Sequence, residues 1–78
     1  MDYIATFYTH LSAMRTHKEL KKRGADARLA PVPRKLSSSC GTCVFYTADA
    51  PMLECMDSDY EAVYGAQGEN YTRLSYKE

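Results

Sequence analysis

The 78-residue chain has no tryptophan, no net charge and no long hydrophobic run. Ten Lys and Arg balance ten Asp and Glu, which argues against a general nucleic-acid binder, because such proteins carry a strongly basic balance. No apolar run approaches the roughly 20 residues that span a bilayer, and the start of the chain shows no signal-peptide pattern. We therefore expect a cytoplasmic protein that contacts neither nucleic acid nor membrane.

Most catalytic and metal-binding motifs are missing as well. There is no Gly-rich phosphate loop, no nucleophile elbow and no His-rich metal pattern. Zinc needs four N or S ligands, usually as two spaced pairs, and Cys40 and Cys43 form a single close pair. We expect no metal and no cofactor, with zinc left open as a weak alternative that would need Cys55 and a histidine. A carrier or binding protein is expected before a stand-alone enzyme.

The length predicts one domain, residues 1–78, with a small core. Chains of this size bury only about 60% of their unfolded surface, so they often depend on a partner, a metal or a covalent link. Charge is unevenly distributed, because residues 15–23 are basic and residues 49–59 are acidic. Each segment is either a solvated face or a docking surface.

Hydrophobic patterning predicts an α+β fold. Alternating, aromatic and β-branched residues predict strands, at 2–8, 25–33, 42–47 and in a hairpin across 60–76 around a Gly-Glu-Asn turn. Helical spacing predicts two helices, at 9–24 and 49–59. The order β-α-β-β-α-β-β, with both helices on one face of the sheet, predicts a small two-layer α/β sandwich.

The first predicted helix has clear end signals. Thr9 is the expected N-cap, basic residues crowd the last turn and Gly24 follows as the αL cap. The second has Asp49 as its expected N-cap and Pro51 in its first turn. The apolar face of the first helix is predicted to comprise Leu11, Ala13, Met14 and Leu20.

The stretch "VPRKLSSSCGTCVFYT" at 32–47 carries the most chemistry. Hydroxyl and backbone donors with nearby positive charge favour thiolate over thiol at Cys40, and thiolate is the reactive form. Gly41 permits a positive φ or a close approach by a ligand. An inert cysteine in a polar turn would have the same local sequence. The candidate contacts of the thiolate or its ligand are Arg34, Lys35, Ser37, Ser38, Ser39 and Gly41.

The segment "RLAPVPRKLSSSCG" at 28–41, together with the preceding strand and helix "YIATFYTHLSAMRTHKELKKRG", resembles the selenium/sulfur (Se/S) carrier protein-like family of small microbial proteins, formerly a domain of unknown function. The resemblance implies a small ferredoxin-like, sulfur-carrier-like sandwich. It also implies that Cys40 holds a persulfide or selenosulfide and relays it between sulfur or selenium donor and acceptor proteins. Arg34, Ser38, Ser39 and Gly41 match the motif around the carrier cysteine.

One position departs from the pattern that the resemblance implies. A small or aliphatic residue is expected where this chain has Cys43. Three interpretations stay open: a strand residue facing the core, a resolving thiol that attacks a Cys40 persulfide or sulfenate, or a metal ligand with Cys40. A thioredoxin-type site is not expected, because a strand follows the CxxC pair where thioredoxins have a helix.

A second function class also fits the sequence. The Ser-rich loop around Cys40 is then a non-catalytic anion or partner contact, or Cys40 and Cys43 form a thiol–disulfide switch. His10 is expected to be a surface or capping residue before it is a catalytic base. The tyrosines of the hairpin at 60–76 are either cross-strand pairs or the contact surface of a homodimer.

Overall fold

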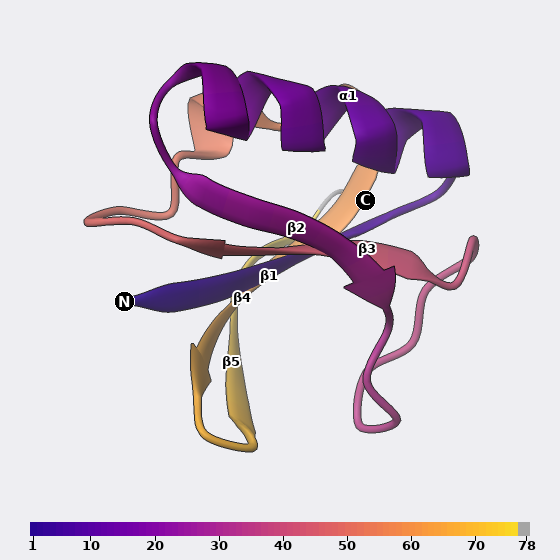
Figure 1. The fold of residues 1–78 in the computed structure, drawn as a ribbon. Coiled ribbons are helices and arrows are strands. Elements are labelled where there is room, and N and C mark those ends of the chain that lie inside the picture. Colours follow the sequence, from indigo (N-terminus) through magenta and orange to yellow (C-terminus); the bar gives the residue numbers. More distant parts are fainter. Residues whose placement is uncertain (77–78) are drawn as a thin grey trace.

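The computed structural model describes residues 1–76, which form one helix and one five-stranded sheet (Figure 1). The strands are β1 Asp2–Phe7, β2 Asp26–Pro31, β3 Thr42–Thr47, β4 Tyr60–Gln67 and β5 Asn70–Tyr76. The helices are α1 His10–Lys22 and the 3₁₀ turn η1 Leu53–Cys55. Within residues 1–76, no helix combines the length and the apolar character needed to cross a membrane.

The sheet has the strand order β2-β3-β1-β4-β5, and every neighbouring pair is antiparallel. The first four strands follow the order of the ferredoxin-like split βαβ unit, and β5 adds an edge strand beside β4. α1 crosses one face of the sheet, while the tip of the β4–β5 hairpin and the connection from β2 to β3 descend on the other side (Figure 1). The predicted α+β two-layer arrangement is confirmed.

The core lies between α1 and the sheet. Side chains alternate along a strand, so Tyr3, Ala5 and Phe7 of β1 point toward the helix together with Val44 and Tyr46 of β3. The Tyr3 and Tyr46 rings stack with their centroids 5.2 Å apart. Large aromatic side chains therefore fill most of the space beneath the helix.

The ends of α1 follow the sequence signals. The Thr9 side chain accepts a hydrogen bond from the Ser12 N–H at 3.1 Å, as an N-cap does. Gly24 takes a φ of 91°, and its N–H donates to the Lys21 carbonyl at 3.0 Å. The Ala25 N–H donates to the Leu20 carbonyl, also at 3.0 Å. This pair of bonds is a Schellman motif, which satisfies carbonyls that the helix end leaves free.

The prediction of the buried helix face was partly wrong. Ala13 and Leu20 are buried, but Leu11 and Met14 are 54% and 47% exposed. The helix buries small polar residues beside them, Ser12 and Thr16. The aromatic side chains of the sheet already occupy the interface, so small helix residues allow the close approach and the longer ones point outward.

The second predicted helix, at 49–59, is wrong. This segment is irregular except for the three residues of η1. Proline disfavours the α conformation of the residue before it, so Pro51 acts against a helix at Ala50. Met52 then takes a φ of 53°, which no right-handed helix contains. Further along, the Asp57 N–H is bonded to Thr16 Oγ1 of α1 at 2.9 Å.

Candidate functional site

The segment that connects β2 to β3, residues 32–41, is called the cysteine loop below. The Val32 N–H donates to the Gly41 carbonyl at 3.1 Å and closes the base of the loop. A turn forms within it where the Leu36 N–H donates to the Pro33 carbonyl at 3.0 Å. Gly41 has a φ of 73°, and no atom lies within 4 Å of the position that a Cβ would take there. The loop therefore presents Cys40 next to an open, side-chain-free position.

Cys40 is half-buried at the base of this loop and packs against the core beneath α1. Its Sγ lies 3.4 Å from the Thr42 carbonyl oxygen, to which the thiol donates. The Ser38 hydroxyl is 4.0 Å from the same sulfur. The sulfur is thus held by Thr42 at the start of β3 and by Ser38 of the loop, and the residue keeps part of its surface in solvent.

The other two cysteines are buried. Cys43 is 0% exposed in β3, with its Sγ 3.6 Å from the Pro31 carbonyl oxygen. Burial raises the pKa of the Cys43 thiol to about 11. Cys55 is 5% exposed in η1, and burial raises its pKa as well. All three cysteines are free thiols, and Cys40 is the one that solvent reaches.

Cys43 and Cys40 lie on different sides of the sheet. The neighbour of Cys43, Val44, points into the core beneath α1, so strand alternation turns Cys43 to the opposite face. Cys40 packs against the core on the α1 side. The structure thus places Cys43 as a buried strand residue, and a role as resolving thiol or ligand requires the start of β3 to rearrange.

The serine donors of the loop are directed mainly to a carboxylate. Glu61 of β4 accepts hydrogen bonds from the Ser39 N–H to Oε1 at 3.0 Å and from Ser39 Oγ to Oε2 at 3.1 Å. The Ser38 hydroxyl lies 2.8 Å from Glu61 Oε1 and 2.8 Å from the Phe7 carbonyl oxygen. Since it has one proton, it donates to one of these two acceptors at a time. Glu61 therefore holds the loop from the start of β4.

Sequence reasoning missed Glu61. A single carboxylate within the apolar strand segment "YEAV" needs hydrogen-bond donors when it is half-buried, and the run of three serines at 37–39 could supply them. That signal does not identify the pair, because Glu61 is 22 residues from Ser39 in the sequence.

The basic residues of the loop point elsewhere. Lys35 Nζ donates to the Glu69 carbonyl oxygen at 3.1 Å, which links the cysteine loop to the β4–β5 turn. Arg34 and Lys35 also line a small cavity of about 200 Å³, together with Tyr71. Ser37 is exposed. Of the predicted contacts, the structure brings Ser38 to the sulfur and takes Lys35 to the hairpin.

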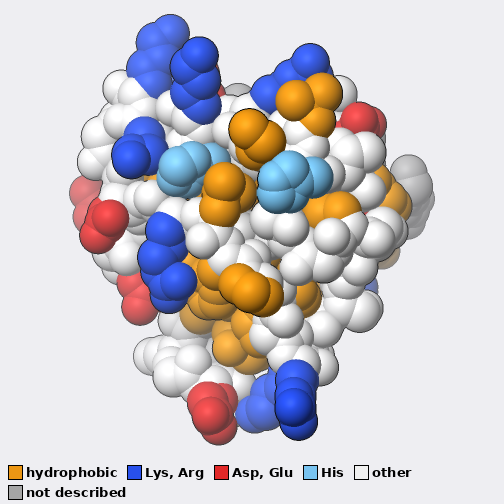
Figure 2. Space-filling view, turned by 45° about the vertical axis from the view of Figure 1, so that its right-hand side comes forward, with side chains coloured by type: hydrophobic (Ala, Val, Ile, Leu, Met, Phe, Trp, Pro, Cys, Tyr) orange, Lys and Arg blue, Asp and Glu red, His pale blue; other side chains and the backbone are white. Residues whose placement is uncertain are grey.

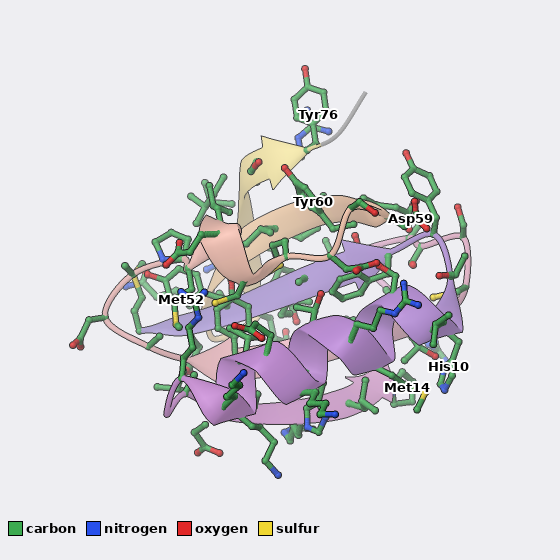
Figure 3. The ribbon with its side chains drawn as sticks, turned by 90° about the horizontal axis from the view of Figure 1, so that it is seen from above. His10, Met14, Met52, Asp59, Tyr60 and Tyr76 are labelled. Atoms are coloured by element: carbon green, nitrogen blue, oxygen red, sulfur yellow. The ribbon has the colours of Figure 1, made fainter. Side chains whose placement is uncertain are left out.

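His10 lies beside the cysteine loop at the first residue of α1. Its Nδ1 is 3.2 Å from Thr42 Oγ1, and the carbonyl of the same Thr42 accepts from Cys40. Figure 3 shows His10 next to Met14 at one end of α1, with Met52 at the other. His17 instead ties α1 to β2, with Nε2 3.2 Å from the Ala27 carbonyl oxygen. Among residues 1–76, no three His, Cys, Asp or Glu side chains group as metal ligands.

Comparison with known proteins gives one family. A family model described as "Putative Se/S carrier protein-like" matches residues 2–61. This range includes the whole cysteine loop and ends at Glu61. No curated protein and no solved structure matches the chain.

Proposed function

Because this chain belongs to the Se/S carrier protein-like family, we propose that it carries a sulfur or selenium atom on Cys40, as a persulfide or selenosulfide, between donor and acceptor proteins. The contrast among its three thiols carries this proposal. Cys43 and Cys55 are buried, whereas Cys40 is half-buried in a loop beside a glycine. A carrier needs one accessible sulfur, since the partner must reach it.

The transfer balances without an added oxidant or reductant. The Cys40 thiolate attacks the outer sulfur of a donor's protein-bound persulfide. An S–S bond forms at Cys40 Sγ, the S–S bond of the donor breaks, and the donor leaves as a thiolate that takes up the proton released by Cys40. The products are a Cys40 persulfide and a donor thiol. Delivery to an acceptor thiol is the same step with the roles exchanged.

The loop supports this chemistry by holding the sulfur in place. Glu61 fixes Ser38 and Ser39 immediately before Cys40, and Val32 bonds to Gly41 immediately after it. The absence of a side chain at Gly41 leaves space for a donor's persulfide. Fixing the nucleophile on both sides lowers the entropy cost of the aligned attack.

Intact-mass spectrometry after incubation with a cysteine desulfurase and cysteine tests the proposal. Wild type and Cys43→Ser are expected to gain the mass of one sulfur atom, while Cys40→Ser does not. If Cys43 acts as a resolving thiol, the wild-type adduct decays faster than the adduct on Cys43→Ser. No adduct on any variant, together with slow alkylation of Cys40, contradicts the carrier and favours a non-covalent binding module.

A further inference from the structure

An exposed apolar area lies beside the cysteine loop and is called the docking face below. It is formed by the N-terminal half of α1 and the end of β2. Leu11 and Met14 are about half exposed, and Leu29 is 37% exposed. Figure 2 shows this side of the molecule, with both histidines on it, hydrophobic side chains between and below them, and Lys and Arg side chains around. The docking face comprises His10, Leu11, Met14, Leu29 and Pro31.

The docking face is continuous with the carrier thiol. Pro31 pairs with Thr42 across β2 and β3, and His10 Nδ1 contacts the Thr42 hydroxyl. The Thr42 carbonyl accepts from Cys40. A protein that covers the docking face therefore also borders the sulfur, which is what a transfer between two cysteines requires.

The charge of the segments that form and surround the docking face is mostly basic, although acidic side chains also lie at the edge of this view (Figure 2). Residues 10–48 contain eight Lys and Arg against two Asp and Glu, whereas residues 49–69 contain six Asp and Glu and no Lys or Arg. Lys18 and Lys21 follow Met14 at helical spacings of four and seven, so they extend the same side of α1. The acidic segment pairs with the other side of the helix, through Arg15 with Asp57 and Arg23 with Glu54.

We propose that the docking face binds the sulfur donor itself, through a donor surface that is apolar at its centre and acidic at its rim. This rests on the proposed carrier function. A few well-packed residues near the centre of a contact supply most of its affinity, and complementary charge accelerates encounter. A second copy of this chain fits less well, because a two-fold contact between two such faces would oppose two basic rims.

The test compares two sulfur sources on matched variants. Leu11→Asp and Met14→Asp remove apolar surface and add charge that repels an acidic donor. Leu11 lies in the first turn of α1, where the helix dipole favours a carboxylate, so the fold is kept. Leu53→Asp, at a residue 43% exposed in η1, is the matched control. Each protein is loaded either by a cysteine desulfurase with cysteine or by inorganic polysulfide, which needs no docking.

We expect the initial rate of loading by the desulfurase to fall about tenfold in Leu11→Asp and Met14→Asp and to change less than about twofold in Leu53→Asp. Loading by polysulfide is expected to be equal in all four proteins. The wild-type rate with the desulfurase is expected to fall as salt rises to about 0.5 M, because salt screens the rim charges.

Each contrary result has its own meaning. Equal rates of loading by the desulfurase in Leu11→Asp and wild type would overturn the proposal that the docking face binds the donor. The same holds if polysulfide loads the wild type but the desulfurase does not. Polysulfide that leaves wild-type Cys40 unmodified overturns the carrier function instead. A wild type that dimerises, with Leu11→Asp monomeric and its transfer rate unchanged, assigns the face to a second copy and also overturns the proposal.

Discussion

Glu61 lies in β4 and Cys40 lies in the cysteine loop, yet Glu61 helps to position Cys40 through the two serines that precede it. The carboxylate accepts from the backbone and side chain of Ser39 and lies 2.8 Å from the Ser38 hydroxyl. Hydrogen bonds to an ionised carboxylate are stronger than those between neutral groups. The position of Cys40 therefore depends on a carboxylate that does not contact its sulfur.

Glu61→Gln is expected to loosen the cysteine loop. The amide keeps the shape of the side chain but has one acceptor oxygen where the carboxylate has two, so one Ser39 bond is lost. We expect a loss of about 1–2 kcal/mol in unfolding free energy and a several-fold faster alkylation of Cys40, measured with a thiol reagent in a Cys43→Ser background. Glu69→Gln is the control, since only the backbone carbonyl of Glu69 is used. An unchanged alkylation rate in Glu61→Gln would contradict the role given to the carboxylate.

Cys43 is expected to make the free energy of unfolding depend on pH in the alkaline range. Its folded-state pKa is about 11, raised by burial from an ordinary 9.0, so the folded state holds the thiol proton more tightly than the unfolded state does. The resulting stabilisation is complete below pH 9 and is lost as pH rises through about 11. A shift of this size corresponds to a contribution on the order of 3 kcal/mol.

Urea unfolding of Cys40→Ser and of the double variant Cys40→Ser with Cys43→Ala, at a series of pH values, measures this contribution. Both proteins are kept reduced, so that disulfides do not interfere. The destabilisation caused by Cys43→Ala is expected to shrink as pH rises from about 8 to about 11. Only the protein that retains Cys43 loses unfolding free energy through deprotonation of this thiol. A destabilisation that stays constant over this range would show that Cys43 titrates alike in the folded and unfolded states.

At the scale of elements, α1 buries two small polar residues, Ser12 and Thr16, beside the apolar Ala13 and Leu20. Ser12 is buried and its Oγ has no hydrogen-bond partner among residues 1–76, whereas Thr16 Oγ1 accepts from the Asp57 N–H. A buried hydroxyl without a partner costs free energy. The two hydroxyls on one helix face are therefore expected to have opposite effects on stability.

Ser12→Ala is expected to raise the free energy of unfolding by up to about 1 kcal/mol, since it removes an unsatisfied group and favours the helix. Thr16→Val is expected to lower it by about 1–3 kcal/mol, since the Asp57 N–H loses its acceptor. Thermal and urea denaturation of the two single variants check both values. Destabilisation by Ser12→Ala of the size seen in Thr16→Val would mean that the Ser12 hydroxyl has a partner in solution.

The elements with local signals could be predicted from the sequence. Alternation predicts the strand at 42–47, and the turn residues predict the hairpin turn at Gly68 and Glu69. The capping residues predict both ends of α1. The Asp-x-Pro sequence at residues 49–51 resembles a helix start, so the sequence could not show that the second predicted helix is absent. Its absence follows from the left-handed backbone of Met52 and the long-range hydrogen bond of Asp57. Which face of α1 is buried depends on the aromatic residues of the sheet below it, and the helix sequence does not contain that information.

The candidate site shows the same division. Cys40 and Gly41 can be selected from the sequence because cysteine chemistry and positive φ are properties of single residues. The partners of Ser38, Ser39 and Lys35 could not be selected, since they lie in β4 and the β4–β5 turn. Proximity in sequence made Lys35 a predicted neighbour of the sulfur, but its contact in the structure is the hairpin.

At the scale of the whole molecule, a net charge of zero conceals two regions of opposite sign. Eight of the ten basic residues lie in residues 10–48, which form α1, β2, the cysteine loop and β3. Six of the ten acidic residues lie in residues 49–69, which include η1 and β4. Such a molecule attracts its own copies head to tail when charges are unscreened. A homodimer through the tyrosine-rich hairpin would have a different origin, because strand pairing at β5 is not driven by charge.

Light scattering at increasing salt separates the two modes. We expect weak, concentration-dependent self-association at about 0.01 M salt that disappears by about 0.5 M, because charges farther apart than the Debye length no longer interact. The double variant Lys18→Glu and Lys21→Glu is expected to lose it at low salt. A dimer that survives high salt and this double variant would instead indicate pairing through β5, where Leu74 and Tyr76 are exposed.

The anchoring of the cysteine loop by the last two strands also orders events during synthesis. A ribosome makes Cys40 before it makes Glu61 and Glu69, and these two residues provide the contacts of Ser38, Ser39 and Lys35. A nascent chain that has only emerged as far as β3 has its thiol but lacks the contacts with Glu61 and Glu69 that anchor the cysteine loop. The sulfur is thus placed in its final setting only after translation has reached the C-terminal hairpin.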